Sequence, residues 1–203
     1  MLEGPTRDWR ADRRSAATAD IVATAWELAR EHGLAGLSMR DLARRLGMAA
    51  PSLYSYVDSK MALYDAMYAD GWRSVLALGD PPPSEDVRTA LLDVHRSYLA
   101  WALEDPVRFQ LLNQRTIPGF TPSPASYALA QDAYDRSFAR LDELVVLTQD
   151  DRDLVTAVFA GLVSQHFAND PGGTRWVRLL EDAVDLLVPR LEARPTRQAL
   201  RQG

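Results

Sequence analysis

Residues 38–57 constrain the fold of this chain more strongly than any other segment. Leu42 and Leu46 are four residues apart, as are Leu53 and Val57, so each pair lies on one face of a short helix. The two apolar faces can pack against each other if a tight turn separates the helices. The spacing therefore predicts two short helices joined by a turn, which is the helix-turn-helix arrangement.

The residues around the turn suit this arrangement. Ala43 is small enough to let the second helix approach closely, and Gly47 can adopt the left-handed conformation that ends a helix. The second helix would expose small or hydrogen-bonding groups that can lie against base edges in a DNA major groove, namely Ala50, Pro51, Ser52, Ser55 and Tyr56. The alternative interpretation of the motif is an ordinary helical corner with no nucleic-acid partner.

The distribution of charge is compatible with DNA binding, although the net charge of the chain is −5. The first 75 residues carry equal numbers of basic and acidic side chains, so the excess of acid lies in residues 76–203. Local charge is what a nucleic acid meets. Between residues 38 and 60 that local charge is positive, with Arg40, Arg44, Arg45 and Lys60 against Asp41 and Asp58.

Helical spacing dominates the rest of the chain and strand signals are scarce, so we predict an all-α fold of about nine helices. The expected helices are 16–32, 38–46, 50–57, 59–78, 84–104, 106–115, 124–147, 150–168 and 174–192. Three consecutive prolines within residues 79–83 cannot continue a helix. They indicate a boundary between an amino-terminal domain built on a three-helix helix-turn-helix unit, residues 16–78, and a helical domain, residues 84–203. Residues 1–15 are expected to form a flexible arm, and the alternative is that this arm reaches an adjacent minor groove of DNA.

Local signals refine the second domain. Thr148 is a suitable N-cap residue for a helix, and Asp151, three residues later, can provide the second side chain of a capping box. Pro189 is expected to end or kink the last helix, and the Arg- and Gln-rich tail beyond about residue 193 is expected to fray.

Residues 16–70 resemble the DNA-binding domain of the TetR family of bacterial regulators, of the kind called AcrR-like. The resemblance is carried by the segments 36–43, 46–47 and 51–57 and by Lys60 with Leu63. It implies that Arg40 contacts a base or a phosphate and that Tyr54, Tyr56 and Lys60 meet the DNA backbone. Ala50 departs from the family, since a polar residue commonly stands there. For Lys60, a solvated residue at the start of a helix is the alternative.

The second half of the chain carries two wide apolar helices, 150–168 and 174–192, that can bury one face internally and another against a second copy. The resemblance implies such a four-helix dimer interface, and a fully internal helix pair is the alternative. The candidate interface residues are Leu154, Val158, Leu162, Trp176, Leu180, Val184 and Leu187.

Aromatic side chains with a few polar groups between residues 95 and 138 suggest a small-molecule site. Its candidate residues are Tyr98, Trp101, Phe109, Asn113, Phe120 and Tyr127, together with His166. The segments 101–109, 117–120 and 169–173 are similar to the WHG-type subfamily of these regulators. For any single aromatic residue, a place in the core is the alternative.

These features predict a homodimeric, cytoplasmic transcriptional repressor that binds palindromic operator DNA and is released by a small-molecule effector. The same fold could serve an activator, and an all-helical enzyme or an adaptor are the remaining alternatives. We expect no enzyme, because nucleophile and phosphate-loop motifs are lacking. We also expect no cofactor, no metal site and no membrane association. No motif in the sequence identifies the effector, the operator or the regulated genes.

Overall fold

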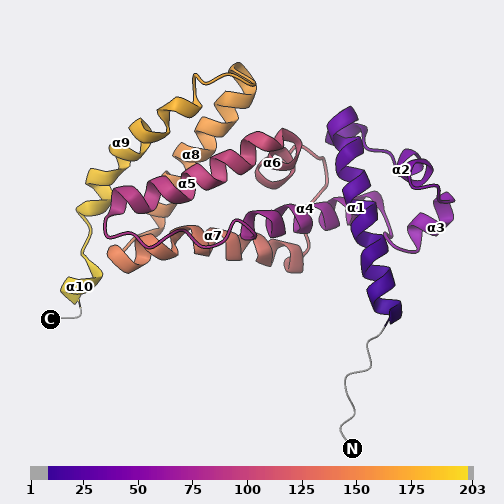
Figure 1. Cartoon of the computed structure of the whole chain (residues 1–203), viewed down its shortest axis with the longest axis horizontal. Helices are drawn as coiled ribbons and strands as arrows, with labels where there is room; N and C mark the ends of the chain where they lie inside the picture. Colours follow the sequence, from indigo (N-terminus) through magenta and orange to yellow (C-terminus); the bar gives the residue numbers. More distant parts are fainter. Residues whose placement is uncertain (1–8, 201–203) are drawn as a thin grey trace, which may run out of the picture. The chain divides into compact units, whose positions relative to one another are not determined.

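The all-α prediction is confirmed. A computed structural model describes residues 9–200, apart from the side chains of residues 10–12, 198 and 200, and these residues form helices and no β-strand (Figure 1). The elements are α1 (Trp9–Gly36), α2 (Met39–Arg45), α3 (Ala50–Tyr54), α4 (Lys60–Leu76), α5 (Val87–Glu104), α6 (Pro106–Asn113), α7 (Pro124–Leu144), α8 (Gln149–Asn169), the 3-10 helix η1 (Val177–Leu179), α9 (Leu180–Glu192) and α10 (Arg197–Leu200).

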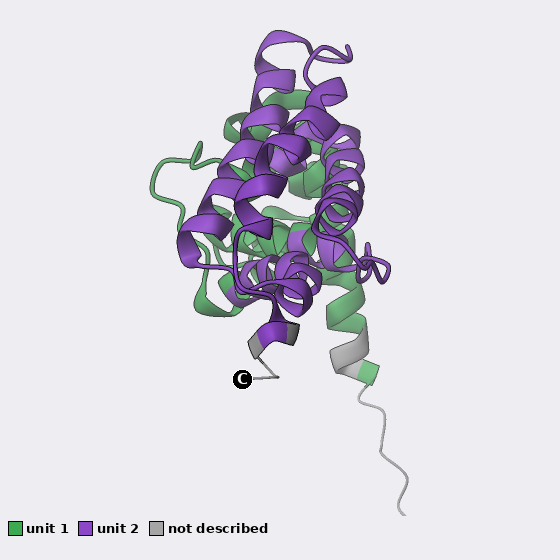
Figure 2. Cartoon of the chain, turned by 90° about the vertical axis from the view of Figure 1, so that its left-hand side faces the viewer, with its two compact units in different colours: residues 1–71, 110–127 green, residues 72–109, 128–203 purple. Residues whose placement is uncertain are grey.

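The chain divides into two compact units (Figure 2). Unit 1 comprises residues 1–71 and 110–127, and unit 2 comprises residues 72–109 and 128–203. The predicted domains were separated at the prolines of residues 79–83 instead. The difference arises because residues 110–127, which lie far along the sequence, make their contacts within unit 1. The assignment of functional domains itself stays a prediction.

In unit 1, α1 and α4 enclose the core beside the two short helices. Trp26 of α1 is buried, and its Nε1 donates a hydrogen bond to Asp70 Oδ2 over 2.8 Å. Gly33, with φ of 73°, interrupts the regular helix close to the predicted end at residue 32. The start differs, because residues 9–15 of the predicted arm are the first turns of α1, and residues 1–8 lie outside the described residues.

The segment before α7 is fastened to α4 within unit 1. The Asp65 carboxylate accepts hydrogen bonds from Ser123 N at 2.7 Å, Ser123 Oγ at 2.8 Å and Ser126 Oγ at 2.9 Å. Phe120 lies edge-on to Tyr68, with 6.2 Å between the ring centroids. Three hydrogen bonds and an aromatic contact therefore hold the start of α7 against the same helix.

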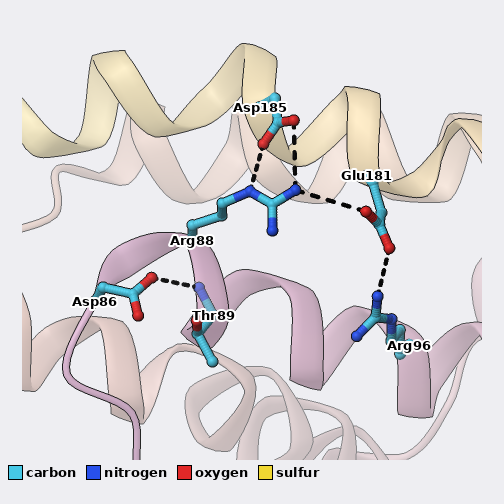
Figure 3. A network of polar contacts seen from close by, with 6 residues as sticks. All are labelled: Asp86, Arg88, Thr89, Arg96, Glu181 and Asp185. Carbon is cyan, nitrogen blue, oxygen red and sulfur yellow. Dashed lines mark hydrogen bonds and ion pairs between the residues drawn. The ribbon is translucent and has the colours of Figure 1, made fainter.

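In unit 2, α5 packs against α8 and α9, and α8 packs against α9. The exposed edge between α5 and α9 carries an ion-pair network (Figure 3), in which Arg88 binds Asp185 and Glu181, and Glu181 also binds Arg96. Because these side chains are about half exposed, the network contributes little to the free energy of folding. The apolar contacts beneath it hold the helices together.

The start of α8 is locked to the end of α9 through Asp151, whose side chain is fully buried. The predicted capping box is confirmed: Thr148 Oγ1 accepts from Asp151 N, and Asp151 Oδ2 accepts from Thr148 N. Asp151 Oδ1 accepts from Arg190 Nε at 2.9 Å and from Arg194 Nη2 at 2.8 Å. Burial by itself would raise the pKa of Asp151, but the bonds from Arg194, Thr148 and Arg190 outweigh it and hold the pKa well below its ordinary range.

Two local predictions concern the carboxy terminus. Pro189 does not end α9, which continues to Glu192, the predicted end of the last helix, and Arg190 just after the proline is bound by Asp151. The segment that follows is ordered too: Val146 N donates to Pro195 O at 2.9 Å, and the end of α7 thereby pairs with it. Within residues 9–200, no helix has the length and apolar character needed to cross a bilayer.

Candidate functional site

Helices α2 and α3 of unit 1 form the predicted helix-turn-helix. Leu42 and Leu53 are fully buried, and Ala43 between the two helices is 2% exposed. Gly47 has φ of 64°, the left-handed conformation expected of it, and Met48 N donates to Ala43 O as the chain turns. The helices meet over small and apolar side chains, as the spacing predicts.

The outer face of α3 presents the candidate DNA-contacting residues to solvent. Ala50, Pro51, Ser52, Tyr54 and Ser55 are all exposed, Tyr54 to 46%. Tyr56 is half-buried just beyond the end of the helix, which stops at Tyr54 and not at residue 57 as predicted. The exposed groups are small or end in a hydroxyl, so this face can approach the floor of a major groove closely.

The basic side chains near this face differ in their partners. Arg44 is paired with Asp41 in the same helix, and Arg45 forms two hydrogen bonds with Glu31 of α1, at 3.0 and 2.7 Å. The bonds with Arg45 lower the pKa of Glu31. Within residues 9–200, no acidic group lies in ion-pair distance of Arg40, which is exposed. Arg40 is thus the arginine of this segment best placed to meet a phosphate.

Lys60 begins α4 at the edge of the same unit. Its Nζ donates a hydrogen bond of 3.3 Å to Ala35 O and lies 5.5 Å from the centroid of the Tyr64 ring. The side chain is half-buried, and its ammonium group already interacts with other residues of the same protein. Both interpretations of Lys60, a phosphate contact and a helix-start residue, agree with this position.

One further arginine belongs beside this face although the sequence assigned it to the arm. Arg14 of α1 donates from Nη2 to Ser55 O at 2.8 Å, and its guanidinium lies 5.7 Å from the Tyr56 ring centroid. The partners are 41 residues apart in the sequence. The sequence predicted a flexible arm over residues 1–15, because no local pattern reveals a contact over such a distance.

The candidate ligand residues fall into both compact units. In unit 2, Tyr98 stacks on Trp101 with 5.4 Å between centroids, and Trp101 donates from Nε1 to Ser74 Oγ. Phe109 is 1% exposed and packs on Phe167 at 5.5 Å. These contacts are also what core residues would make, so they favour neither interpretation.

His166 combines burial with an open hydrogen-bonding position. The residue is 4% exposed, and among the described residues no partner lies within hydrogen-bond distance of its Nδ1. In unit 1, Asn113, Phe120 and Tyr127 complete the candidate set. Phe120 packs against Tyr68, whereas Tyr127 is 51% exposed.

The candidate dimer residues of α8 and α9 occupy different environments. Leu180, Val184 and Leu187 are between 0 and 7% exposed and belong to the core of unit 2. Leu154 is 38% exposed, and Val158, Leu162 and Trp176 are half-buried. The sequence missed Leu186, which is 81% exposed on α9. Leu186 lies off the apolar face that Leu180, Val184 and Leu187 share at helical spacing, so the spacing that marks the core of α9 does not mark it.

No cluster of histidine, aspartate or glutamate suited to a metal ion occurs in the part of the chain that the structure describes. The two histidines of the second half are separate: His95 stacks on Phe159 with 3.5 Å between centroids, and burial lowers the pKa of His95 to about 4. The helix-turn-helix face of unit 1 remains the candidate functional surface.

Fold and surface together define a helical protein with an amino-terminal helix-turn-helix. Residues 21–67 match the model for bacterial regulatory proteins of the tetR family. The predicted resemblance to the TetR family is confirmed over this segment, which contains the helix-turn-helix.

Curated relatives match over a longer segment than the family model does. An HTH-type transcriptional regulator of Mycobacterium tuberculosis is 31% identical over 119 residues, 57% of this chain and 51% of that protein. The chain thus matches about half the length of this curated relative.

Solved structures share the fold. A tetR-family transcriptional regulator from Streptomyces coelicolor has a TM-score of 0.64 at 18% identity, with 90% of each chain covered. A single-residue variant of TetR from Acinetobacter baumannii AYE, solved in complex with minocycline, has a TM-score of 0.57 at 22% identity, covering 85% of this chain and 94% of that one.

Proposed function

We propose that this protein is a DNA-binding transcriptional regulator that inserts α3 into the major groove. The exposed face of α3, held by the buried pair Leu42 and Leu53, is the observation that carries the proposal. Its relatives' names as transcriptional regulators support it. The acidic net charge of the chain is compatible with it, because Arg40 and Lys60 stand beside α3 and the acidic excess lies elsewhere.

In finer detail, the proposal is a homodimeric repressor of a palindromic operator. The exposed face of α8 supports a dimer, because Leu154, Ala157, Val158 and Gly161 follow one another at helical spacing on its surface. Leu186 adds a large exposed apolar side chain on the neighbouring α9. A two-fold axis through such a face would use the same patch twice and present two copies of α3 to DNA.

Release by a small-molecule effector is the last part of the proposal. It is supported by the aromatic content of α5 and α6 and by the open Nδ1 of buried His166. An effector that binds one conformer better than another lowers operator affinity by the same factor by which DNA lowers effector affinity. Activation of transcription by the same DNA-binding protein is the second candidate.

The DNA-binding proposal is tested by selecting fragments from a random-sequence duplex library with the purified protein. We expect a palindromic sequence to be enriched, and Arg40→Ala to weaken its binding about 5- to 100-fold, as loss of one base or charge-assisted phosphate contact does. The exposed Arg136→Ala on α7 is a matched control that removes the same charge far along the chain. Enrichment of no sequence by the wild-type protein would falsify the proposal.

The dimer is tested separately by sedimentation. Val158→Arg places a charge in the proposed interface and is expected to give a monomer. Thr156→Arg, on the same helix but another face, should stay dimeric. Leu180, Val184 and Leu187 are unsuitable for this test because they are buried within the protomer, so charges there would unfold the protein. A dimeric Val158→Arg variant would place the interface elsewhere.

A further inference from the structure

The helix that would enter the groove has few stabilising groups of its own at its ends, namely Pro51 in the first turn and the Ser55 hydroxyl, which donates to Ser52 O. α3 has five residues, no side-chain hydrogen bond at its N-cap Ala49, and no basic residue in its last turn. In α2, by contrast, Ser38 caps the first turn and Arg44 and Arg45 lie in the last. A helix this short is not stable by itself in water. α3 therefore depends on groups from elsewhere in unit 1.

Arg14 of α1 supplies a cation at the carboxyl end of α3. Its bond of 2.8 Å goes to the carbonyl of Ser55, which is the C-cap residue of α3. Carbonyl groups in the last turn of a helix lack intrahelical donors, and a positive charge there also interacts favourably with the helix dipole. The guanidinium reaches the ring of Tyr56 as well, at 5.7 Å. The same side chain thus contacts both residues that follow α3.

We propose that Arg14 is a positioning residue for the recognition helix, acting on DNA through Ser55 and Tyr56. It does so by holding the carboxyl end of α3, in place of the basic residue that α3 itself lacks. This inference rests on the proposed function, because it assigns Arg14 a part in DNA recognition. The alternative is that Arg14 contacts a phosphate directly, and the two roles differ in what they do to sequence preference.

Three variants separate these roles. Arg14→Gln removes the cation at the end of α3, and Arg14→Lys keeps a charged donor that can still reach the Ser55 carbonyl. Arg13→Gln is the matched control, since Arg13 is the adjacent exposed arginine and lies over the Trp9 ring, 5.1 Å from its centroid. Each glutamine variant changes the net charge equally, so a general electrostatic effect on DNA binding is the same for both.

Binding is measured on a duplex enriched by the wild-type protein and on a scrambled duplex of the same length. We expect Arg14→Gln to weaken binding to the enriched duplex about 3- to 10-fold more than Arg13→Gln does, the size of one lost hydrogen bond. On scrambled DNA the two variants should weaken binding equally. Arg14→Lys should recover most of the difference. A loss for Arg14→Gln that is equally large on both duplexes, with a salt slope lowered by about one, would overturn positioning in favour of a phosphate contact.

Amide hydrogen exchange tests the hold on α3 without DNA. The amides of Ser55, Tyr56 and Val57 donate to carbonyls of Ser52 and Leu53 at 3.0 to 3.2 Å. Arg14→Gln should speed their exchange, and Arg13→Gln should leave it unchanged. Exchange that is the same in all variants overturns the proposal, and so does faster exchange without a selective loss of enriched DNA. If the wild-type protein enriches no DNA, the proposed function fails, while the exchange rates still decide whether Arg14 holds α3.

Discussion

Replacement of Asp151 by asparagine should destabilise the protein strongly, although the two side chains have nearly the same size and shape. The two carboxylate oxygens serve different partners: Oδ1 accepts from Arg190 and Arg194, and Oδ2 accepts from Thr148 N and Oγ1. An amide has one acceptor oxygen, and its NH2 group must face either the arginines or the Thr148 amide. Either orientation sets donor against donor at a fully buried position.

The size of the effect follows from burial. Removing one partner of a buried ion pair costs about 3–5 kcal/mol when the charge left behind stays buried. Here the side chains of Arg190 and Arg194 are 45% and 32% exposed and can turn to water, which reduces the cost. We therefore expect Asp151→Asn to lower the free energy of unfolding by about 2–3 kcal/mol, and Tm by about 4–12 °C for a chain of this size.

Asp150→Asn is the matched control. Asp150 lies in the same first turn of α8 and is exposed, so its replacement removes an equal charge from the helix amino terminus without disturbing the buried bonds. Urea unfolding is measured at one protomer concentration, because dimerisation would make stability depend on concentration. If the two variants unfold at the same urea concentration, the buried network does not hold α8 to α9 as argued.

The pH dependence supplies a second check on Asp151. Its folded pKa lies below the ordinary value of 3.8, so its contribution to stability is present above that value. The contribution is lost as pH falls below about 4 towards the lower folded pKa, because the unfolded chain then binds the proton more tightly. The difference in stability between wild type and Asp151→Asn should therefore shrink on acidification. A difference that grows as the solution is acidified would contradict the assigned direction.

The remaining predictions concern three other sites. Burial lowers the pKa of His95 from 6.5 to about 4, so the contribution of His95 to the free energy of unfolding is present above pH 6.5 and falls on acidification. Between pH 7.5 and pH 5, wild type should lose about 1–2 kcal/mol more of its free energy of unfolding than His95→Gln, as measured by urea unfolding. Parallel pH profiles for the two proteins would refute this. Asp65→Asn should lower the free energy of unfolding by about 1–3 kcal/mol and speed amide exchange near Ser123. Replacement of the exposed Asp58 by asparagine should do neither. Equal exchange in both variants would mean that Asp65 does not hold the segment before α7. Lys60→Ala should weaken binding to all duplexes alike and lower the salt slope by about one, and an unchanged slope would exclude a phosphate contact.

Much of the helix-turn-helix could be predicted because its determinants are local. The four-residue spacings of Leu42 from Leu46 and of Leu53 from Val57 and the glycine at position 47 act over a few residues, as does the capping box at Thr148 in the second domain. The backbone geometry of a helix converts such spacings directly into shared faces and ends. The all-helical class, the motif and the family resemblance follow from them.

Contacts between distant segments required the tertiary structure. Arg14 was assigned to an arm and the tail to frayed chain, and each meets a partner more than 40 residues away in the sequence. Packing also decides burial on α8, where Val155 is fully buried and Leu154 is 38% exposed although both are apolar residues of one helix. A local pattern ranks residues by hydrophobicity, whereas only packing selects which apolar face, and which charged partner, each one meets.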